Sequence, residues 1–313
     1  MSVALVFPGQ GSQAVGMGKA LAENFKAAAE VFATVDDALG EKLTAVIWDG
    51  PADKLMLTEN AQPALMAVSL ATLRVLQAEA GFDLKRDVAF VAGHSLGEYS
   101  ALAAAGSLTI ADTARLLRIR GRAMQAAVPV GVGAMAALLG LEFEQVVAVA
   151  AEAAQGEVCQ AANDNGGGQV VVSGNKAAVE RAVEIAKGKG ARRAMLLPVS
   201  APFHCALMQP AADAMAEALA NVTVKAPAVP LVANVLARPV TAPAEIVTSL
   251  IRQVTGTVRW RECVAFMANA GVDSFYEVGA GKVLSGLVKR IAAGATGTAI
   301  GSPEDVAAFK ARA

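Results

Sequence analysis

Apolar and polar residues alternate along the chain in two different patterns. Short apolar runs, typical of buried strands, occupy residues 2–7, 88–93, 229–235 and 274–279. Between them lie long segments with apolar residues three or four positions apart, such as 61–81 and 109–127, and this spacing predicts helices. Strands that alternate with helices are joined by crossover connections. The pattern therefore predicts a mostly parallel sheet with helices on both faces.

The middle of the chain has a different order of elements. Strand patterns at 133–141, 157–163, 168–175 and 192–199 alternate with helical patterns at 142–154 and 176–190. This order, β-α-β-β-α-β, is that of ferredoxin-like units. We expect residues 128–198 to form a small inserted domain, and residues 1–127 and 199–313 to form a large α/β domain.

The first predicted strand leads into a glycine-rich turn, residues 9–14, whose letters are GQGSQA. The spacing fits the G-x-G-x-x-G/A pattern of dinucleotide sites, in which an acid about 20 residues further on binds a ribose. Asp36 is the candidate acid. However, apolar spacing predicts one helix from about Met17 to Leu39, where such a site needs a second strand. The turn lacks the context of a dinucleotide site and needs another role.

Composition narrows the class of protein. A chain of 313 residues fits a large domain with an insertion. Hydrophobic residues make up 55% and aromatic residues only 4%, so the core is built from small and branched aliphatic side chains. A net charge of −1 argues against a nucleic-acid partner. No leader-like segment or long apolar run is present, so we expect a soluble, cytoplasmic protein without a membrane partner.

The three cysteines, Cys159, Cys205 and Cys263, are widely spaced and form no CxxC pair. This spacing indicates neither a disulfide framework nor a zinc site. We expect buried apolar thiols and no metal site.

The strand predicted at 88–93 runs into the sequence GHSLG, residues 93–97, and a helical pattern follows. Strand, sharp turn and helix are the context of a nucleophile elbow with the G-x-S-x-G pattern. In such a turn Ser95 is raised at the edge of the sheet, and the N–H group of the next residue can bind an oxyanion. The alternative interpretation is an ordinary turn whose serine caps the helix.

A serine hydroxyl needs a base within hydrogen-bond reach, and the chain has two histidines. His94 directly precedes Ser95 in a tight turn, where neighbouring side chains diverge. His204 lies in a loop after the last small-domain strand and is the candidate base. The candidate acids Asp164 and Glu180 fall inside the small domain, which argues against a standard triad. Another group, such as a backbone carbonyl, must then orient the imidazole.

Five motifs extend over nearly the whole chain: VFPGQGSQ, GHSLGEYSAL, RGRAMQ, PVSAPFHCALM and YEVGAGKVLSGL. In these motifs the sequence resembles the malonyl-CoA:acyl carrier protein transacylase family of fatty-acid synthesis. The resemblance implies an α/β-hydrolase-like large domain with a ferredoxin-like insert. It also implies ping-pong transfer of a malonyl group from malonyl-CoA to the phosphopantetheine thiol of acyl carrier protein, through a malonyl-serine. We expect a monomer that needs no cofactor besides these substrates.

The same resemblance assigns roles to individual residues. Ser95 is acylated, His204 is the base, and the main-chain carbonyl of Gln253 orients His204. The backbone N–H groups of Gln10 and Leu96 form the oxyanion hole. One such donor is typically worth about 2.7–4 kcal/mol of transition-state stabilisation.

Arg120 matches the family arginine that pairs with the free carboxylate of the substrate. The alternative is one more solvated cation in a run with Arg115, Arg118 and Arg122. A planar guanidinium binds a carboxylate through two parallel hydrogen bonds, which lysine cannot do. Acetyl-CoA would leave the arginine unpaired, and such sites reject analogues that lack the partner by about 10⁴ or more.

Further residues bear on the substrate and the partner. In related polyketide acyltransferases, residues matching Leu96 and Phe203 accompany malonyl rather than methylmalonyl selection, although many fatty-acid enzymes carry a smaller residue than Phe203. Asn163 and Asn165 match asparagines near the pocket, and turn formation is their alternative role. Lys289 and Arg290 are candidates to bind an acidic carrier protein. The alternative is a solvated helix face, because a Lys-Arg pair is common on the exposed side of helices.

Two other classes of function share part of these patterns. A serine esterase or thioesterase would have the same elbow, and a dinucleotide-binding protein would share only the glycine turn. Within the transacylases, fatty-acid and polyketide synthesis both remain open as the pathway served.

Overall fold

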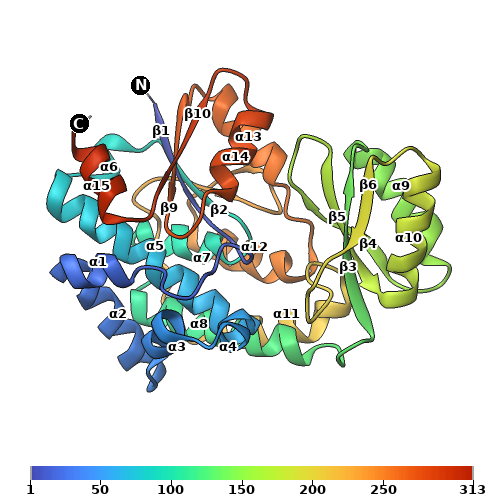
Figure 1. Cartoon of the computed structure of the whole chain (residues 1–313), viewed down its shortest axis with the longest axis horizontal. Coiled ribbons are helices and arrows are strands. Elements are labelled where there is room, and N and C mark those ends of the chain that lie inside the picture. Colours follow the sequence, from blue (N-terminus) through green and yellow to red (C-terminus); the bar gives the residue numbers. More distant parts are fainter. Residues whose placement is uncertain (1, 312–313) are drawn as a thin grey trace.

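The computed structural model describes residues 2–311 and contains two separate sheets (Figure 1). The larger sheet has the strand order β10-β9-β1-β2-β7-β8. Its strands are β1 (Val3–Phe7), β2 (Phe90–Gly93), β7 (Leu231–Ala233), β8 (Arg238–Val240), β9 (Ser274–Val278) and β10 (Thr296–Ile300). All neighbours pair in parallel except β8, which is antiparallel to β7 at the edge. The fold is therefore α/β, with a mostly parallel, mixed large sheet.

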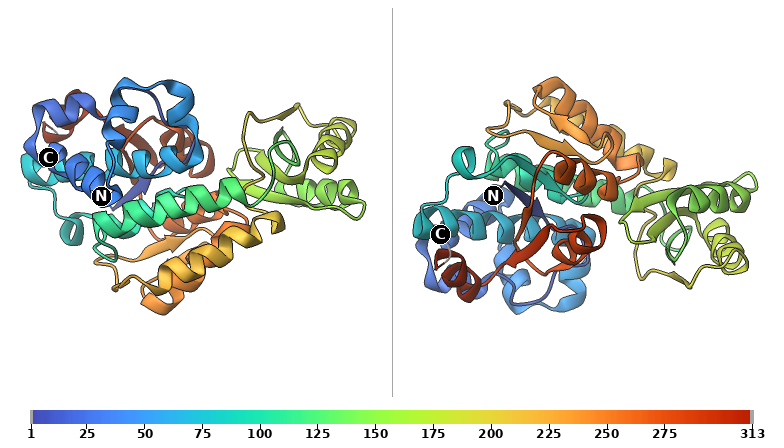
Figure 2. Two further views of the ribbon diagram at one scale, coloured as in Figure 1. Left: turned by 90° about the horizontal axis from the view of Figure 1, so that it is seen from below. Right: turned by 90° about the horizontal axis from the view of Figure 1, so that it is seen from above.

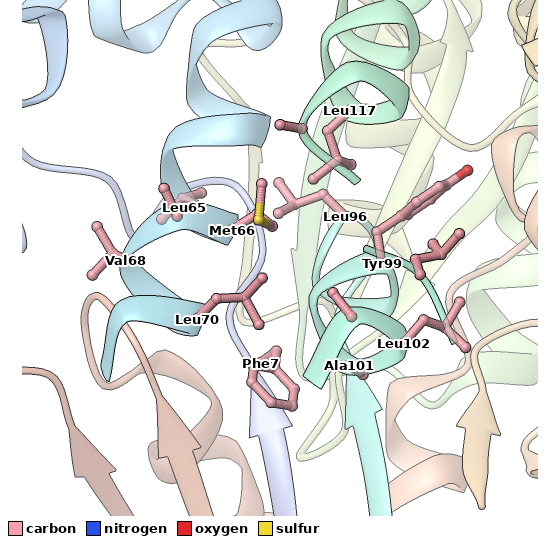
Figure 3. Packing of buried hydrophobic residues seen from close by; sticks show 14 of the residues in the cluster. Phe7, Leu65, Met66, Val68, Leu70, Leu96, Tyr99, Ala101, Leu102 and Leu117 are labelled. Carbon is pink, nitrogen blue, oxygen red and sulfur yellow. The ribbon is translucent and has the colours of Figure 1, made fainter. Parts of the chain in front are cut away.

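Helices cover both faces of the larger sheet. Successive residues of a strand point to opposite faces, so a strand with apolar residues at every position has to be covered on both sides. Leu5 and Phe7 of β1 pack into a core with the helices on one face, and Figure 3 shows part of it around Phe7, Met66 and Leu96. Helices that supply this core include α2 (Lys26–Leu39), α5 (Thr58–Ala80), α7 (Gly97–Ala104), α8 (Ile110–Ala126), α11 (Gln209–Ala220) and α12 (Pro243–Thr255). On the other face Ala4 and Val6 pack against α13 (Trp260–Asn269) and α14 (Val283–Ile291).

The single helix predicted from about Met17 to Leu39 is wrong in one respect, because it is broken at Phe25. Phe25 has an extended backbone, with φ −133° and ψ 118°, and it ends α1 (Lys19–Asn24) and precedes α2. One extended residue turns the chain while the apolar spacing on either side stays helical. The other helices packed around the larger sheet are short: α3 (Leu43–Asp49), α4 (Ala52–Met56), α6 (Leu84–Asp87), η1 (Ala206–Met208) and α15 (Pro303–Lys310).

The smaller sheet forms one end of the molecule (Figure 2). Its elements follow in the order β3 (Gly133–Leu139), α9 (Phe143–Ala154), β4 (Cys159–Asp164), β5 (Gln169–Asn175), α10 (Lys176–Gly188) and β6 (Arg193–Leu196). The strand order is β4-β5-β3-β6, and every neighbouring pair is antiparallel. Both helices pack on this sheet around an apolar cluster of their own.

Strand β4 joins the two parts of the structure. Asp164 donates its backbone N–H to the carbonyl of Val258 at 2.9 Å, and Val258 donates to Ala162 at 2.8 Å. The buried Asp164 carboxylate also pairs with Nε of Arg261 at 2.7 Å. These contacts fix the end of β4 beside the larger sheet. Within residues 2–311, none of the helices has both the length and the apolar character that crossing a membrane requires.

Candidate active site

Two loops meet at one edge of the larger sheet. The glycine turn follows β1 and the serine turn follows β2, and these strands are parallel neighbours with Phe7 opposite Gly93. His94 donates its backbone N–H to the carbonyl of Phe7 at 3.0 Å, so the two turns are in direct contact. The carboxyl ends of parallel strands are a common place for binding sites. This edge therefore brings Gln10 close to Ser95.

The serine turn is sharp and strained. Ser95 has a φ of 53°, in the left-handed region that residues with a side chain rarely adopt. A Cβ atom on Gly93 would lie 2.0 Å from the carbonyl oxygen of Gly97, and one on Gly97 would lie 2.2 Å from the carbonyl oxygen of Phe7. Only glycine fits at both positions. The geometry is that of a nucleophile elbow, with the serine held in the unfavourable backbone conformation that this turn requires.

Asn234, just after β7, holds the turn from the side. Its Oδ1 accepts the backbone N–H of Ser95 at 2.8 Å, and its Nδ2 donates to the carbonyl of Gly93 at 2.8 Å. The sequence reasoning missed this residue. Its position at the end of an apolar strand was a usable signal, because the ends of β1 and β2 carry the other groups of the site.

His204 is in contact with Ser95. Its Nε2 lies 2.8 Å from Ser95 Oγ, and its Nδ1 lies 2.8 Å from the backbone carbonyl oxygen of Gln253. A carbonyl can only accept a hydrogen bond, so Nδ1 carries the hydrogen and the neutral ring presents Nε2 as an acceptor to the serine hydroxyl. Burial, followed by the charge of Arg120, lowers the pKa of His204 to about 3. His94 does not reach Ser95, and its Nε2 lies 2.9 Å from Asn165 Oδ1.

Arg120 is fixed beside Ser95 and is only 1% exposed, so it is not a solvated cation. Its NH1 donates to Gln62 at 2.8 Å, and its NH2 donates to Gln253 Oε1 at 2.8 Å and to Ser95 Oγ at 3.2 Å. The guanidinium also lies 5.6 Å from the ring centre of Tyr99. Burial lowers its pKa.

The neighbouring arginines of α8 differ from Arg120 in their partners. Arg115 pairs with Asp112, Arg118 with Glu41 and Arg122 with Glu59. Arg120 makes no such ion pair within the described residues, and its Nε has no hydrogen-bond partner. A buried cation without an anion in direct contact is unfavourable. The site is therefore suited to an anionic ligand.

Gln62 and Glu98 also belong to the site, although the sequence reasoning did not single them out. Gln62 donates to Thr58 at 3.1 Å, and Thr58 donates to the side chain of Gln10 at 2.8 Å, which ties the glycine turn to Arg120. Glu98 is fully buried and accepts from Gln253 Nε2 at 3.0 Å. Burial raises the pKa of Glu98 to about 7. Neither Gln62 nor Glu98 can be recognised from the apolar spacing of its helix, because the hydrogen bonds of both side chains form only when the chain is folded.

Two backbone N–H groups at this edge have no acceptor in the described part of the chain. They belong to Gln10 and to Leu96, the residue after Ser95, and both residues line the same cavity. Backbone N–H groups that have no acceptor and lie beside a serine can stabilise an oxyanion.

A cavity of about 560 Å³ opens over these groups. Its walls include Gln10, Ser95, Arg120, Asn163, Phe203 and His204, and Val283 of α14 lies at its exposed rim. Asn163 and Phe203 come from the two sides, β4 and the loop before His204. The size and the few polar groups within apolar walls are typical of a small-molecule site.

Other predicted residues lie outside this cavity. Lys289 and Arg290 are in the last turn of α14, and the side chain of Arg290 lies close to Gly167, in the loop between β4 and β5. The three cysteines are free and buried, and Cys205 donates to the carbonyl of Pro202 at 3.1 Å, as expected for packing residues. Among residues 2–311, His, Cys, Asp and Glu side chains form no group of three or more that could hold a metal.

Comparisons with known proteins show which family the chain resembles. The family model described as "Acyl transferase domain" matches residues 4–299. The malonyl CoA-acyl carrier protein transacylase of Escherichia coli K12 is 48% identical over 97% of each chain. The crystal structure of an acyl-carrier-protein-S-malonyltransferase from Bartonella henselae is 57% identical over 99% of this chain and 98% of that one, with a TM-score of 0.96.

A solved complex is equally similar in structure. It contains a malonyl-transacylase with a type II PKS acyl-carrier protein, and the transacylase is 42% identical over 100% of both chains, with a TM-score of 0.96. The matches extend over the whole chain and include both sheets. The chain therefore belongs to the acyl transferase family and, within it, to the malonyl CoA-acyl carrier protein transacylases.

Proposed function

We propose that the protein transfers a malonyl group from malonyl-CoA to the phosphopantetheine thiol of an acyl carrier protein, through a malonyl ester of Ser95. One observation carries the choice of acyl group: Arg120 is buried beside Ser95 and has no carboxylate partner among the described residues. The free carboxylate of a malonyl group supplies the missing anion. Relatives named as malonyl transacylases support the same assignment.

The first half of the reaction acylates Ser95. His204 Nε2 accepts the hydroxyl proton as Oγ attacks the thioester carbonyl, and the carbonyl of Gln253 holds the resulting imidazolium through Nδ1. The backbone N–H groups of Gln10 and Leu96 bind the oxyanion of the tetrahedral intermediate. When this intermediate collapses, the C–S bond breaks and the CoA thiol leaves with the proton from His204.

The second half reverses these roles. The phosphopantetheine thiol enters the cavity vacated by CoA, His204 takes its proton, and the sulfur attacks the carbonyl of the serine ester. The ester C–O bond then breaks, Ser95 Oγ leaves with the proton from His204, and the malonyl group departs as the carrier-protein thioester. The same oxyanion hole serves both halves. The reaction is ping-pong because CoA leaves and the malonyl group stays on Ser95 before the second thiol binds. Residues of this chain perform every step, and we propose that no cofactor takes part besides the two substrates.

The shape of the cavity supports selection of the malonyl group. Leu96 and Phe203 are both buried at the cavity wall, and we propose that their side chains exclude a branch on the acyl chain. Asn163 lines the side that β4 provides. Selection against acetyl groups depends on Arg120, because an acyl group without a carboxylate leaves its buried charge unpaired.

The carrier protein and the domain organisation are further parts of the proposal. Lys289 and Arg290 lie on the helix that forms the cavity rim and could attract an acidic carrier protein. Residues 128–198 form a ferredoxin-like domain inserted in an α/β-hydrolase-like domain, in line with the antiparallel order β4-β5-β3-β6. We also propose a cytoplasmic monomer.

Labelled malonyl-CoA tests the proposal. We expect one stable label on Ser95, located by mass spectrometry, which holo-acyl carrier protein removes; Ser95→Ala is the unlabelled control. Rapid loss of label to water would indicate a thioesterase, and absence of label would refute the enzymatic function. His204→Ala should label far more slowly, and an unchanged rate would remove His204 from the mechanism. Carrier proteins of fatty-acid and polyketide synthesis, compared as acceptors, distinguish the pathways.

A further inference from the structure

Glu98 is a buried carboxylate directly behind the serine turn. It lies in the first turn of α7 and its side chain is fully buried. Oε2 accepts the backbone N–H of Asn234 at 2.9 Å and Nε2 of Gln253 at 3.0 Å, whereas Oε1 has no hydrogen-bond partner. A buried carboxylate is unfavourable unless a cation compensates it. The ionised form of Glu98 therefore needs such a charge nearby.

Arg120 is that cation, and the side chain of Gln253 connects it to Glu98. Oε1 of Gln253 accepts from Arg120 at 2.8 Å, while Nε2 donates to Glu98. The other titratable groups that face Glu98 are Tyr99 on the same helix and Cys263 on α13. Burial raises the pKa of Tyr99 to about 12 and raises that of Cys263, so both are neutral near pH 7.5. Arg120 and Glu98 thus form a charge pair separated by one amide.

We infer that Glu98 is a positioning residue that balances the charge of Arg120 in the unloaded protein and takes up a proton when an acyl group with a free carboxylate binds Arg120. The inference rests on the proposed function, since it requires malonyl loading. Before loading, the positive charge of Arg120 favours ionised Glu98. After loading, the acyl carboxylate pairs with Arg120 and places a second negative charge near Glu98, which favours the protonated form. Oε2 keeps its two hydrogen bonds, and the proton goes to the unpartnered Oε1.

Proton counting during acylation tests this inference. The chemistry of acylation is balanced in protons, because the hydroxyl proton of Ser95 leaves on the thiol of CoA as a C–O bond replaces the C–S bond. The wild-type protein is mixed with malonyl-CoA at about pH 7.5 in weakly buffered solution with an indicator dye. Mass spectrometry of the same sample counts malonyl-Ser95. The measured quantity is the number of protons taken up per acylated protein.

The wild type should take up a fraction of a proton, with a ceiling of about 0.75, because about three-quarters of a carboxyl group with a pKa of about 7 is ionised at this pH. Glu98→Gln keeps the side chain's size and an acceptor oxygen and should take up none. Glu180→Gln, an exposed residue of α10, is the matched control and should behave as the wild type. Uptake below about 0.1 proton in the wild type, or equal uptake in Glu98→Gln, would overturn the inference. Failure of the wild type to form malonyl-Ser95 would instead overturn the proposed function, and this inference with it.

The pH profile separates this role from a merely structural one. Because loading takes up a proton, kcat/KM for malonyl-CoA in the wild type should be level just below pH 7 and fall above it, by up to about tenfold per pH unit. In Glu98→Gln the profile should be level across the same range, whereas a structural defect would lower kcat/KM equally at every pH. If Glu98→Gln does not fold, the wild type carrying ¹³C-labelled glutamate still gives a result. Its infrared difference spectrum on loading must show a new protonated glutamate, and absence of that band would overturn the inference.

Discussion

Replacing Asn234 by alanine should loosen the serine turn without touching the reacting atoms. The change deletes two hydrogen bonds of 2.8 Å, one from the Ser95 N–H and one to the carbonyl of Gly93, and a longer one of 3.3 Å from Gln253 Nε2. Gly93 is buried, while Ser95 is partly exposed to the cavity, where water can replace its lost acceptor. A buried polar group without a partner costs about 1–3 kcal/mol. We therefore expect Asn234→Ala to lower the free energy of unfolding by about 1–3 kcal/mol, measured by urea denaturation.

The same substitution should slow acylation of Ser95. The left-handed backbone of Ser95 is unfavourable by about 1–3 kcal/mol, and Asn234 is one of the groups that hold it. If the turn relaxes in the variant, the fraction with Ser95 Oγ facing His204 should fall about tenfold to a hundredfold, since about 1.4 kcal/mol corresponds to a factor of ten. Single-turnover labelling with malonyl-CoA measures this rate.

Asn221→Ala is the matched control for both measurements. The Asn221 side chain also donates to a backbone carbonyl, that of Glu217 at 2.8 Å, but at an exposed helix end. Its loss should change stability by less than about 1 kcal/mol and leave labelling unchanged. If Asn234→Ala were as stable and as reactive as Asn221→Ala, the assigned role of Asn234 would be wrong.

Three further predictions concern the arginine, the histidine and the turn. Arg120→Lys keeps a charge but loses at least one charge-assisted hydrogen bond, so kcat/KM for malonyl-CoA should fall about tenfold to a hundredfold in a steady-state assay, and an undiminished value would contradict the carboxylate pairing. Burial and Arg120 hold the pKa of His204 at about 3, so this base stays neutral in mild acid. We therefore expect kcat/KM not to fall between about pH 6.5 and 5. An acidic limb centred near pH 6.5 would contradict a neutral His204. Gly97→Ala places a Cβ 2.2 Å from the carbonyl oxygen of Phe7 and should lower the free energy of unfolding by at least about 1–3 kcal/mol. The control Gly188→Ala, whose added Cβ has no heavy atom within 4 Å, should lower it by less than about 0.5 kcal/mol. Equal losses of stability would refute the steric argument.

The strands that flank the site were predictable because they are buried on both faces. β1, β2, β7 and β9 lie inside the larger sheet; the first three are continuous apolar runs, and β9 is mostly apolar apart from Ser274 and Glu277. β10 and β8 were not predicted, since both are edge strands. β10 is only partly buried until Ile300, and β8 has three residues, one of which is Pro239. Edge strands need fewer apolar side chains, so periodicity gives little signal for them.

The site was predictable to the extent that local sequence forms it. The pattern around Ser95 encodes its own turn, because Gly93 and Gly97 are required by contacts within a few residues or with the neighbouring strand. His204 was found by elimination, as one of two histidines. Asn234 and Glu98 were not found, because their partners lie more than 130 positions away along the chain and the contacts exist only after folding.

Gln253 shows why a resemblance can identify a residue and still leave part of its chemistry undescribed. Its backbone carbonyl orients His204, a role that the family motifs imply and that any amino acid at this position could fill. Its side chain does more, since Oε1 accepts from Arg120 while Nε2 donates to Glu98 and, at 3.0 Å, to the carbonyl of Ser95. Only a side chain with both an acceptor and a donor can hold a cation and a carboxylate at once. One residue of α12 thereby links His204, the turn of Ser95 and Arg120, so that the proposed recognition of an acyl carboxylate and the orientation of the proposed base depend on the same helix.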